Sequence, residues 1–158
     1  PALVRFAVER GLDISFIEEM PLGRVDDRDR GLAFYPSDQV RADIERHFPL
    51  VPTTEHTGGP SRYYRVQGGA SRVGFISPHS HNFCASCNRV RLTAEGRLLL
   101  CLGQEHSVDL RRVVRAHPGD GAALRRALVE AMAIKPEGHD FDLQGQPVVL
   151  RPMSVTGG

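Results

Sequence analysis

The sequence predicts an α/β protein in two parts, a barrel-like piece in front and a small α+β unit with antiparallel hairpins behind. Helical and strand patterns alternate through the first 48 residues, whereas short strand pairs and then two helices follow. A stretch rich in Pro, Thr and Gly at residues 49–62 separates the two patterns. Since one helix–strand–helix unit cannot close a sheet alone, we expect residues 1–60 to be the last βα unit and linker of a partial TIM-like barrel, and residues 61–158 a second domain.

The front part is expected to begin with an amphipathic helix over residues 2–10, ended by Gly11. The run LDISFIE at 12–18 is apolar and β-prone, which is typical of a buried parallel strand. Polar residues with Pro and Gly at 21–36 predict a loop at the carboxyl end of this strand, where ligand-binding loops of α/β folds lie.

A second helix is expected over residues 37–47, capped by Ser37 or Asp38. Its apolar stripe consists of Val40, Ile44 and Phe48. In the second part, glycine-containing turns predict two hairpins, over residues 63–77 and 89–101. Two further helices are expected at 108–116 and 119–136, the latter capped by Asp120 and ended by Pro136.

Composition points to an ordinary globular protein. Of its 158 residues 41% are hydrophobic and 25% charged, and the formal net charge is +1, so no global field favours nucleic acid or a membrane. No apolar run approaches the ~20 residues of a membrane span. An odd number of cysteines and no signal-peptide pattern favour a reducing, cytoplasmic setting. The chain opens on a helical pattern without Met, so we expect a fragment, with a mature start after Met removal as the alternative.

The three cysteines Cys84, Cys87 and Cys101 form the pattern C-x2-C-x13-C. Disulfides use thiols in pairs, so this pattern is better suited to metal. Three thiolates can hold three corners of a 4Fe–4S cluster and leave one iron open for a ligand. Two alternatives remain: a zinc site completed by His79 or His81, and a redox pair that would leave the third cysteine unexplained.

Two other features accompany the cysteines. Arg89 and Arg91 follow the second cysteine, and residues two apart on a strand point to the same face. Two guanidinium groups there would form an anion or purine site, although an isolated pair of this kind is more often a solvated strand face. Gly157 and Gly158 end the chain; such an end is usually frayed, but without side chains it can also enter a narrow site.

Three motifs resemble one family. The run FISPHSHNFCASCNRVRLTAEGRLLLCLG at 75–103, FIEEMPLG at 16–23 and the ending MSVTGG at 153–158 occur in the family's order over nearly the whole chain. They are similar to the C-terminal part of the molybdenum cofactor biosynthesis protein A family. Its members are radical S-adenosylmethionine (SAM) enzymes, the GTP 3′,8-cyclases.

The resemblance implies a set of roles. The three cysteines would ligate the second of two 4Fe–4S clusters, whose open iron would bind GTP. Arg89, Val90 and Arg91 would contact GTP, and Met20 would lie against SAM. Gly157 and Gly158 would reach the active site as catalytic residues.

The resemblance also implies a reaction. In the family, a first cluster cleaves SAM to a radical that removes the 3′ hydrogen of GTP, and the sugar carbon then attacks C8 to give 3′,8-cyclo-7,8-dihydro-GTP. The implied partners are an N-terminal radical SAM half, an electron donor such as flavodoxin or ferredoxin, and a second copy in a homodimer. Neither nucleic acid nor a membrane is expected.

Two departures from the family pattern bear on function. No cysteine precedes Cys84, so the radical-generating C-x3-C-x2-C is absent and the isolated chain is expected to be inactive. Ser15 stands where the family usually has Arg, which puts one substrate or SAM contact in doubt; Thr156, where the family often has Ile, is a smaller departure. The alternative function is a non-catalytic, stand-alone iron–sulfur or zinc module.

Overall fold

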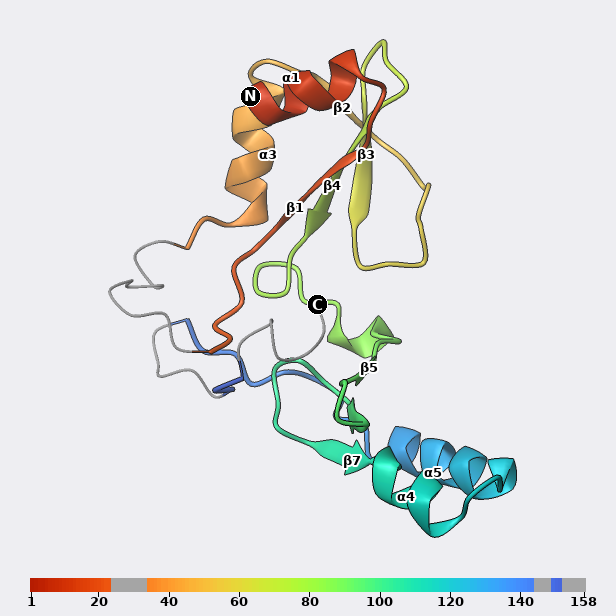
Figure 1. The fold of residues 1–158 in the computed structure, drawn as a ribbon. Helices are drawn as coiled ribbons and strands as arrows, with labels where there is room; N and C mark the ends of the chain where they lie inside the picture. Colours follow the sequence, from red (N-terminus) through yellow and green to blue (C-terminus); the bar gives the residue numbers. More distant parts are fainter. Residues whose placement is uncertain (24–33, 144–148, 152–158) are drawn as a thin grey trace. The chain divides into compact units, whose positions relative to one another are not determined.

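The computed structural model describes residues 1–23, 34–143 and 149–151 (Figure 1). These residues form two compact units. One contains residues 1–20 and 34–83; the other contains 21–23, 84–143 and 149–151. None of the helices in these ranges has the length and apolar character that a membrane crossing requires.

The first unit is built on a four-stranded sheet of order β1-β4-β3-β2 among the described residues. Its strands are β1 (Ile14–Ile17), β2 (Leu50–Pro52), β3 (Arg62–Val66) and β4 (Arg72–Ile76). The strand β1 pairs in parallel with β4, in the register Ile14↔Val73, whereas β2–β3 and β3–β4 are antiparallel. The parallel geometry predicted for the first strand is confirmed.

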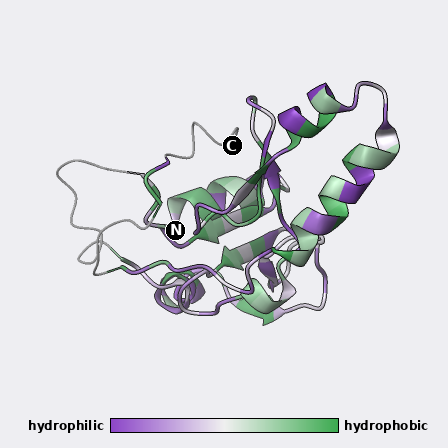
Figure 2. Cartoon of the chain, turned by 90° about the horizontal axis from the view of Figure 1, so that it is seen from below, coloured by the Kyte–Doolittle hydropathy of each residue, from purple (hydrophilic) through white to green (hydrophobic). Residues whose placement is uncertain are grey.

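Two helices, α1 (Ala2–Glu9) and α3 (Ser37–Glu45), pack on one face of this sheet. Their buried side chains join those of the sheet in one cluster: Val4, Ile44, Val66, Val73 and Phe75. The predicted stripe of the second helix is confirmed, since Ile44 is buried and Val40 and Phe48 pack against it. Hydrophobic and hydrophilic residues are mixed along the helices (Figure 2), as expected when only one face is buried.

The expected burial of the first strand is wrong. Positions along β1 alternate between half-buried and exposed, and Ile17 remains 56% exposed. Only one side of the strand faces α1 and α3, so the apolar run contributes one face to the core rather than two.

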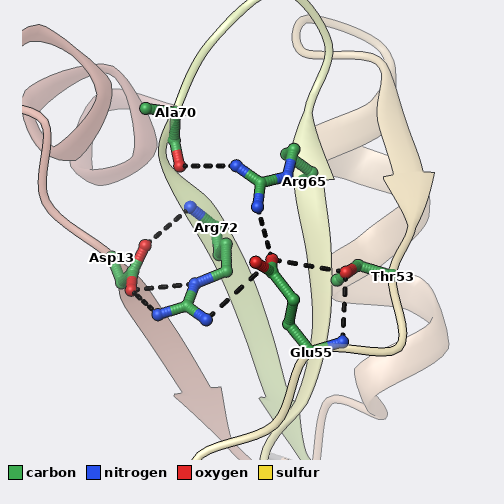
Figure 3. A network of polar contacts seen from close by, with 6 residues as sticks. All are labelled: Asp13, Thr53, Glu55, Arg65, Ala70 and Arg72. Atoms are coloured by element: carbon green, nitrogen blue, oxygen red, sulfur yellow. Dashed lines mark hydrogen bonds and ion pairs between the residues drawn. The ribbon is translucent and has the colours of Figure 1, made fainter.

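A polar network ties β1, β3 and β4 together at the edge of the first unit (Figure 3). Asp13 accepts hydrogen bonds from the Arg72 backbone at 2.8 Å and from its guanidinium at 2.5 and 3.0 Å. Glu55 lies 2.5 Å from Arg65 and 4.0 Å from Arg72. The Arg72 guanidinium lowers the pKa of Asp13 below its ordinary value. These groups help to fix the register of β1 on β4.

The second unit holds a three-stranded antiparallel sheet of order β5-β6-β7 in its described part, with two helices. The elements are β5 (Arg91–Leu92), β6 (Arg97–Leu99), β7 (Ser107–Asp109), α4 (Leu110–Ala116) and α5 (Gly121–Ala133). Leu98, Leu100, Leu110 and Ala131 form its core, and Leu100 is fully buried. Asp120 caps α5 as predicted, because its carboxylate accepts from the amides of Ala122 and Ala123.

Three local expectations differ from the structure. Residues 50–52, expected in a linker, form β2, and residues 107–109 form β7 where a helix was expected to begin. The N-cap of α3 is Pro36, and neither Ser37 nor Asp38 caps it by a side-chain hydrogen bond. Short strands follow from pairing partners distant in sequence, which a local pattern does not report.

The compact units also divide the chain at different places from the expected boundary at residue 60. Strands β3 and β4 lie after that boundary, yet they hydrogen-bond into the sheet that contains β1. The observed architecture is mixed α/β with antiparallel pairing in both sheets. The partial barrel remains a proposal taken from the resemblance.

Candidate functional site

The three cysteines lie in the second unit and none is in a disulfide. Cys84 begins a single 3-10 turn, Cys84–Ser86, and the amide of Cys87 donates to the carbonyl of Cys84 at 3.0 Å. This hydrogen bond closes the turn and brings the backbones of the two cysteines close together. All three cysteines are half-buried, so their side chains are neither fully solvated nor sealed in the core.

The third cysteine follows the buried core of the second unit. Leu100 is fully buried, and Cys101 comes directly after it at the end of β6. Burial raises the pKa of the Cys101 thiol; the amide of Gly103, which hydrogen-bonds to it, and the charge of Lys135 act in the opposite direction. The thiols of Cys84 and Cys87 interact electrostatically with Cys101. The third cysteine therefore lies in the same unit as the other two.

The hairpin of β5 and β6 carries the two arginines toward the cysteines. Arg91 on β5 pairs with Leu99 on β6. β5 begins at Arg91 and β6 ends at Leu99, so Arg89 and Cys101 lie two residues outside this pairing. Burial alternates here, since Arg89 and Arg91 are half-buried while Val90, at 39%, is exposed. Arg89 and Arg91 are thus both less exposed than the residue between them, and a shared face stays a prediction because Arg89 lies outside β5.

The sequence allows two kinds of metal site at the cysteines, a cluster and a single zinc ion. Within the described ranges, no three His, Cys, Asp or Glu side chains gather as ligands of a single metal ion. Ligands of one zinc ion must converge on a point, whereas each thiolate of a cubane cluster ligates a different iron. The structure therefore does not decide between a cluster and a single ion at these three cysteines.

The two histidines considered as zinc ligands have other partners in the first unit. The Nε2 atom of His79 lies 3.0 Å from the carbonyl oxygen of Glu19, and its ring meets Phe34 edge-on. The Nε2 atom of His81 lies 2.8 Å from a carboxylate oxygen of Asp38. A ring nitrogen engaged in this way must lose that contact before it can ligate a metal.

A buried carboxylate organises the segment that leads to the cysteines. Glu18 is 3% exposed and follows β1. It accepts hydrogen bonds from the amides of Ser37 and His79 at 2.9 Å and of Ser80 at 3.1 Å, and from the Ser80 hydroxyl. These hydrogen bonds overcome the opposing effect of burial and lower its pKa to about 2. It also satisfies the first amide of α3, which explains why that helix has no side-chain cap of its own.

Two of the expected contacts belong to the first unit, and two lie outside the described residues. Met20 is half-buried and follows the Glu18 position by two residues. Ser15, the departure from the family, shares a hydrogen bond with Ser61 at 3.0 Å. Gly157 and Gly158 lie outside the described residues, so their expected role stays a proposal.

Sequence reasoning missed Glu18 and the residues that pack on the cysteines. Glu18 sits in an acidic pair, and nothing local distinguishes it from Glu19 beside it. Gly103 is buried two residues after Cys101, where a side chain would collide with residues 139 and 141. A glycine so near an expected ligand was the one available signal.

The described residues form a mixed α/β protein whose three cysteines are outside any disulfide. Residues 12–141 match the family Molybdenum Cofactor Synthesis C, and the chain belongs to that family. Among relatives named GTP 3′,8-cyclase, the protein of Saccharophagus degradans is 58% identical over 156 residues, covering 99% of this chain and 47% of the relative. Those of Marinobacter nauticus and Ectopseudomonas mendocina are 58% and 60% identical, covering 100% and 99% of this chain and 48% and 47% of theirs. The chain spans about half the length of these relatives, and the resemblance noted in the sequence is confirmed at the level of the family.

Proposed function

We propose that this chain is the cluster-bearing, GTP-binding C-terminal portion of a GTP 3′,8-cyclase in molybdenum cofactor synthesis. One observation carries the proposal: Cys84, Cys87 and Cys101, in the spacing C-x2-C-x13-C, are reduced and half-buried in one unit. The relatives named GTP 3′,8-cyclase, which are 58–60% identical over nearly all of this chain, give the proposal its reaction.

The three thiolates would hold a 4Fe–4S cluster, which supplies an iron with an open coordination position that acts as a Lewis acid toward a purine nitrogen. Arg89 and Arg91 would bind the anionic part of GTP, since a guanidinium gives planar, paired hydrogen bonds to phosphate. The Val90 backbone between them would add a further polar contact. Together these residues fix where the ribose stands, and such positioning supplies several kcal/mol of barrier lowering in enzymes.

In this proposal, cleavage of SAM and transfer of the radical depend on components other than the three cysteines of this chain. SAM cleavage would need the N-terminal half with its own cluster, together with an electron donor such as flavodoxin or ferredoxin. Met20 would lie against SAM, and Gly157 and Gly158 would reach the reacting atoms. A homodimer is a compatible assembly.

Anaerobic reconstitution with iron and sulfide tests the proposal. The wild-type chain is expected to retain about four iron atoms, and replacing any one cysteine by serine should strongly reduce that number. The matched control replaces His79 and His81 by alanine together, which should leave the iron content unchanged. About one zinc ion in place of iron, lost in the double-histidine variant, would favour the structural zinc module instead.

A further inference from the structure

A loop of residues 135–141, directly after α5, packs on the cysteine site from one side. Gly138 lies against Cys84, since a methyl group added there would stand 3.9 Å from the Cβ atom of Cys84. Lys135, at the start of the loop, is close enough to act electrostatically on Cys101. The loop therefore lies against the first cysteine, and its residues His139 and Phe141 lie against Gly103, two positions after the third cysteine.

Gly103 and Gln104, in the turn that follows Cys101, hold the loop against this turn. The side-chain amide of Gln104 donates to the carbonyl of Gly138 at 3.0 Å. Gly103 is buried against the loop, because an added Cβ would come within 2.4 Å of His139 Cβ and 3.0 Å of the Phe141 ring. The His139 and Phe141 rings are packed on each other, with centroids 4.4 Å apart. The contact leaves no room for even a methyl group at Gly103.

We propose that residues 135–141 form a wall that shields the three-thiol centre from solvent, and that Gly103 and Gln104 are the positioning residues that hold this wall in place. This inference extends the proposed function, because a solvent-excluding wall would slow the loss of a bound cluster. It names residues of the chain that act on the thiols through packing rather than as ligands.

The proposed wall can be tested in the metal-free chain, because it should slow the reaction of the cysteines with an alkylating reagent. Alkylation of each cysteine by iodoacetamide can be followed separately by mass spectrometry. Gln104→Ala removes the hydrogen bond to Gly138, and Gly103→Ala forces the loop away. Each should increase the alkylation rate of Cys84 about fivefold, the population change that one lost neutral hydrogen bond produces.

A third variant has the opposite expected sign. In Gly138→Ala the new methyl group makes an ordinary van der Waals contact with Cys84, and the backbone there is not in the left-handed region. It should therefore slow the alkylation of Cys84 without loss of folding. Gln67→Ala, at an exposed position after β3, is the matched control and should change no cysteine's rate.

Two results would contradict the proposal. One is a Cys84 alkylation rate within about twofold of wild type in both Gln104→Ala and Gly103→Ala. The other is faster alkylation of Cys84 in Gly138→Ala. The Gly138 variant keeps the test valid if Gly103→Ala fails to fold. Because the assay uses metal-free protein, its failure is separate from failure of the proposed function, which iron content reports. A chelator should also remove reconstituted iron faster from Gln104→Ala than from Gln67→Ala.

Discussion

Substituting the buried Glu18 by glutamine is the sharpest test of the polar network that precedes the cysteines. Each carboxylate oxygen accepts two hydrogen bonds, one oxygen from the Ser37 amide and the Ser80 hydroxyl, the other from the amides of His79 and Ser80. A glutamine side chain has one oxygen and one NH2 group. Whichever way the amide turns, its NH2 group faces two donors, which leaves buried donors without a partner.

The expected cost follows from the pKa. The network lowers the pKa of Glu18 from 4.5 to about 2. Since one pKa unit corresponds to about 1.4 kcal/mol, the network favours the charged form over the neutral form by about 3 kcal/mol more than water does. Glu18→Gln should lower the free energy of unfolding of the first unit by an amount of that order.

Tyrosine fluorescence during urea unfolding isolates this effect. The chain has three tyrosines, Tyr35, Tyr63 and Tyr64, and no tryptophan. All three lie in the first unit, so the signal reports that unit alone. The control is Glu19→Gln, at the neighbouring exposed position. A loss below about 1 kcal/mol, or one equal to that of the control, would refute the reasoning.

The remaining predictions concern acid unfolding, the Asp13–Arg72 ion pair, the hydrophobic core of the second unit and the conversion of GTP. Because folding lowers the pKa of Glu18, its contribution is present above pH 4.5 and lost as pH falls toward 2; acid unfolding of Glu18→Gln should show a weaker pH dependence in that window. Asp13→Asn, at a partly exposed ion pair with Arg72, should cost only about 0.5–1 kcal/mol by the tyrosine signal, and a larger loss would contradict the structure. Leu100→Ala removes a fully buried side chain and should destabilise the second unit by about 2–5 kcal/mol, measured by circular dichroism with the tyrosine transition unchanged. The chain alone should not convert GTP with SAM, as followed by chromatography; product formed by the chain alone would contradict the assigned division of labour.

Local sequence patterns predicted the elements whose cause is local. The stripe of α3, the glycine turns of both hairpins and the Asp120 cap each depend on residues within a few positions of one another. The cysteine spacing also predicts a metal centre, because ligand spacing is a local property, and this stays a prediction.

What could not be predicted depends on partners far apart in sequence. Strands β2 and β7, three residues each, are defined by the neighbours with which they pair. The hydrogen-bond partners of Glu18 lie 19 and about 60 positions further along the chain. The local sequence therefore could not show that Glu18 is buried and Glu19 exposed. The wall of residues 135–141 is likewise a tertiary contact, joined to Gln104 across 34 positions.

Electron paramagnetic resonance of the reconstituted, reduced chain, with and without GTP, tests the central claim most directly. If the proposed cluster is present, a 4Fe–4S signal should appear and should shift when GTP is added, because three cysteines would leave one iron open to substrate. The shift should weaken in Arg89→Ala and Arg91→Ala, which keep the three thiols but lose the guanidinium contacts. A cluster signal unaffected by GTP would contradict substrate binding at this centre, and a protein that takes up zinc but no iron would contradict the cluster itself.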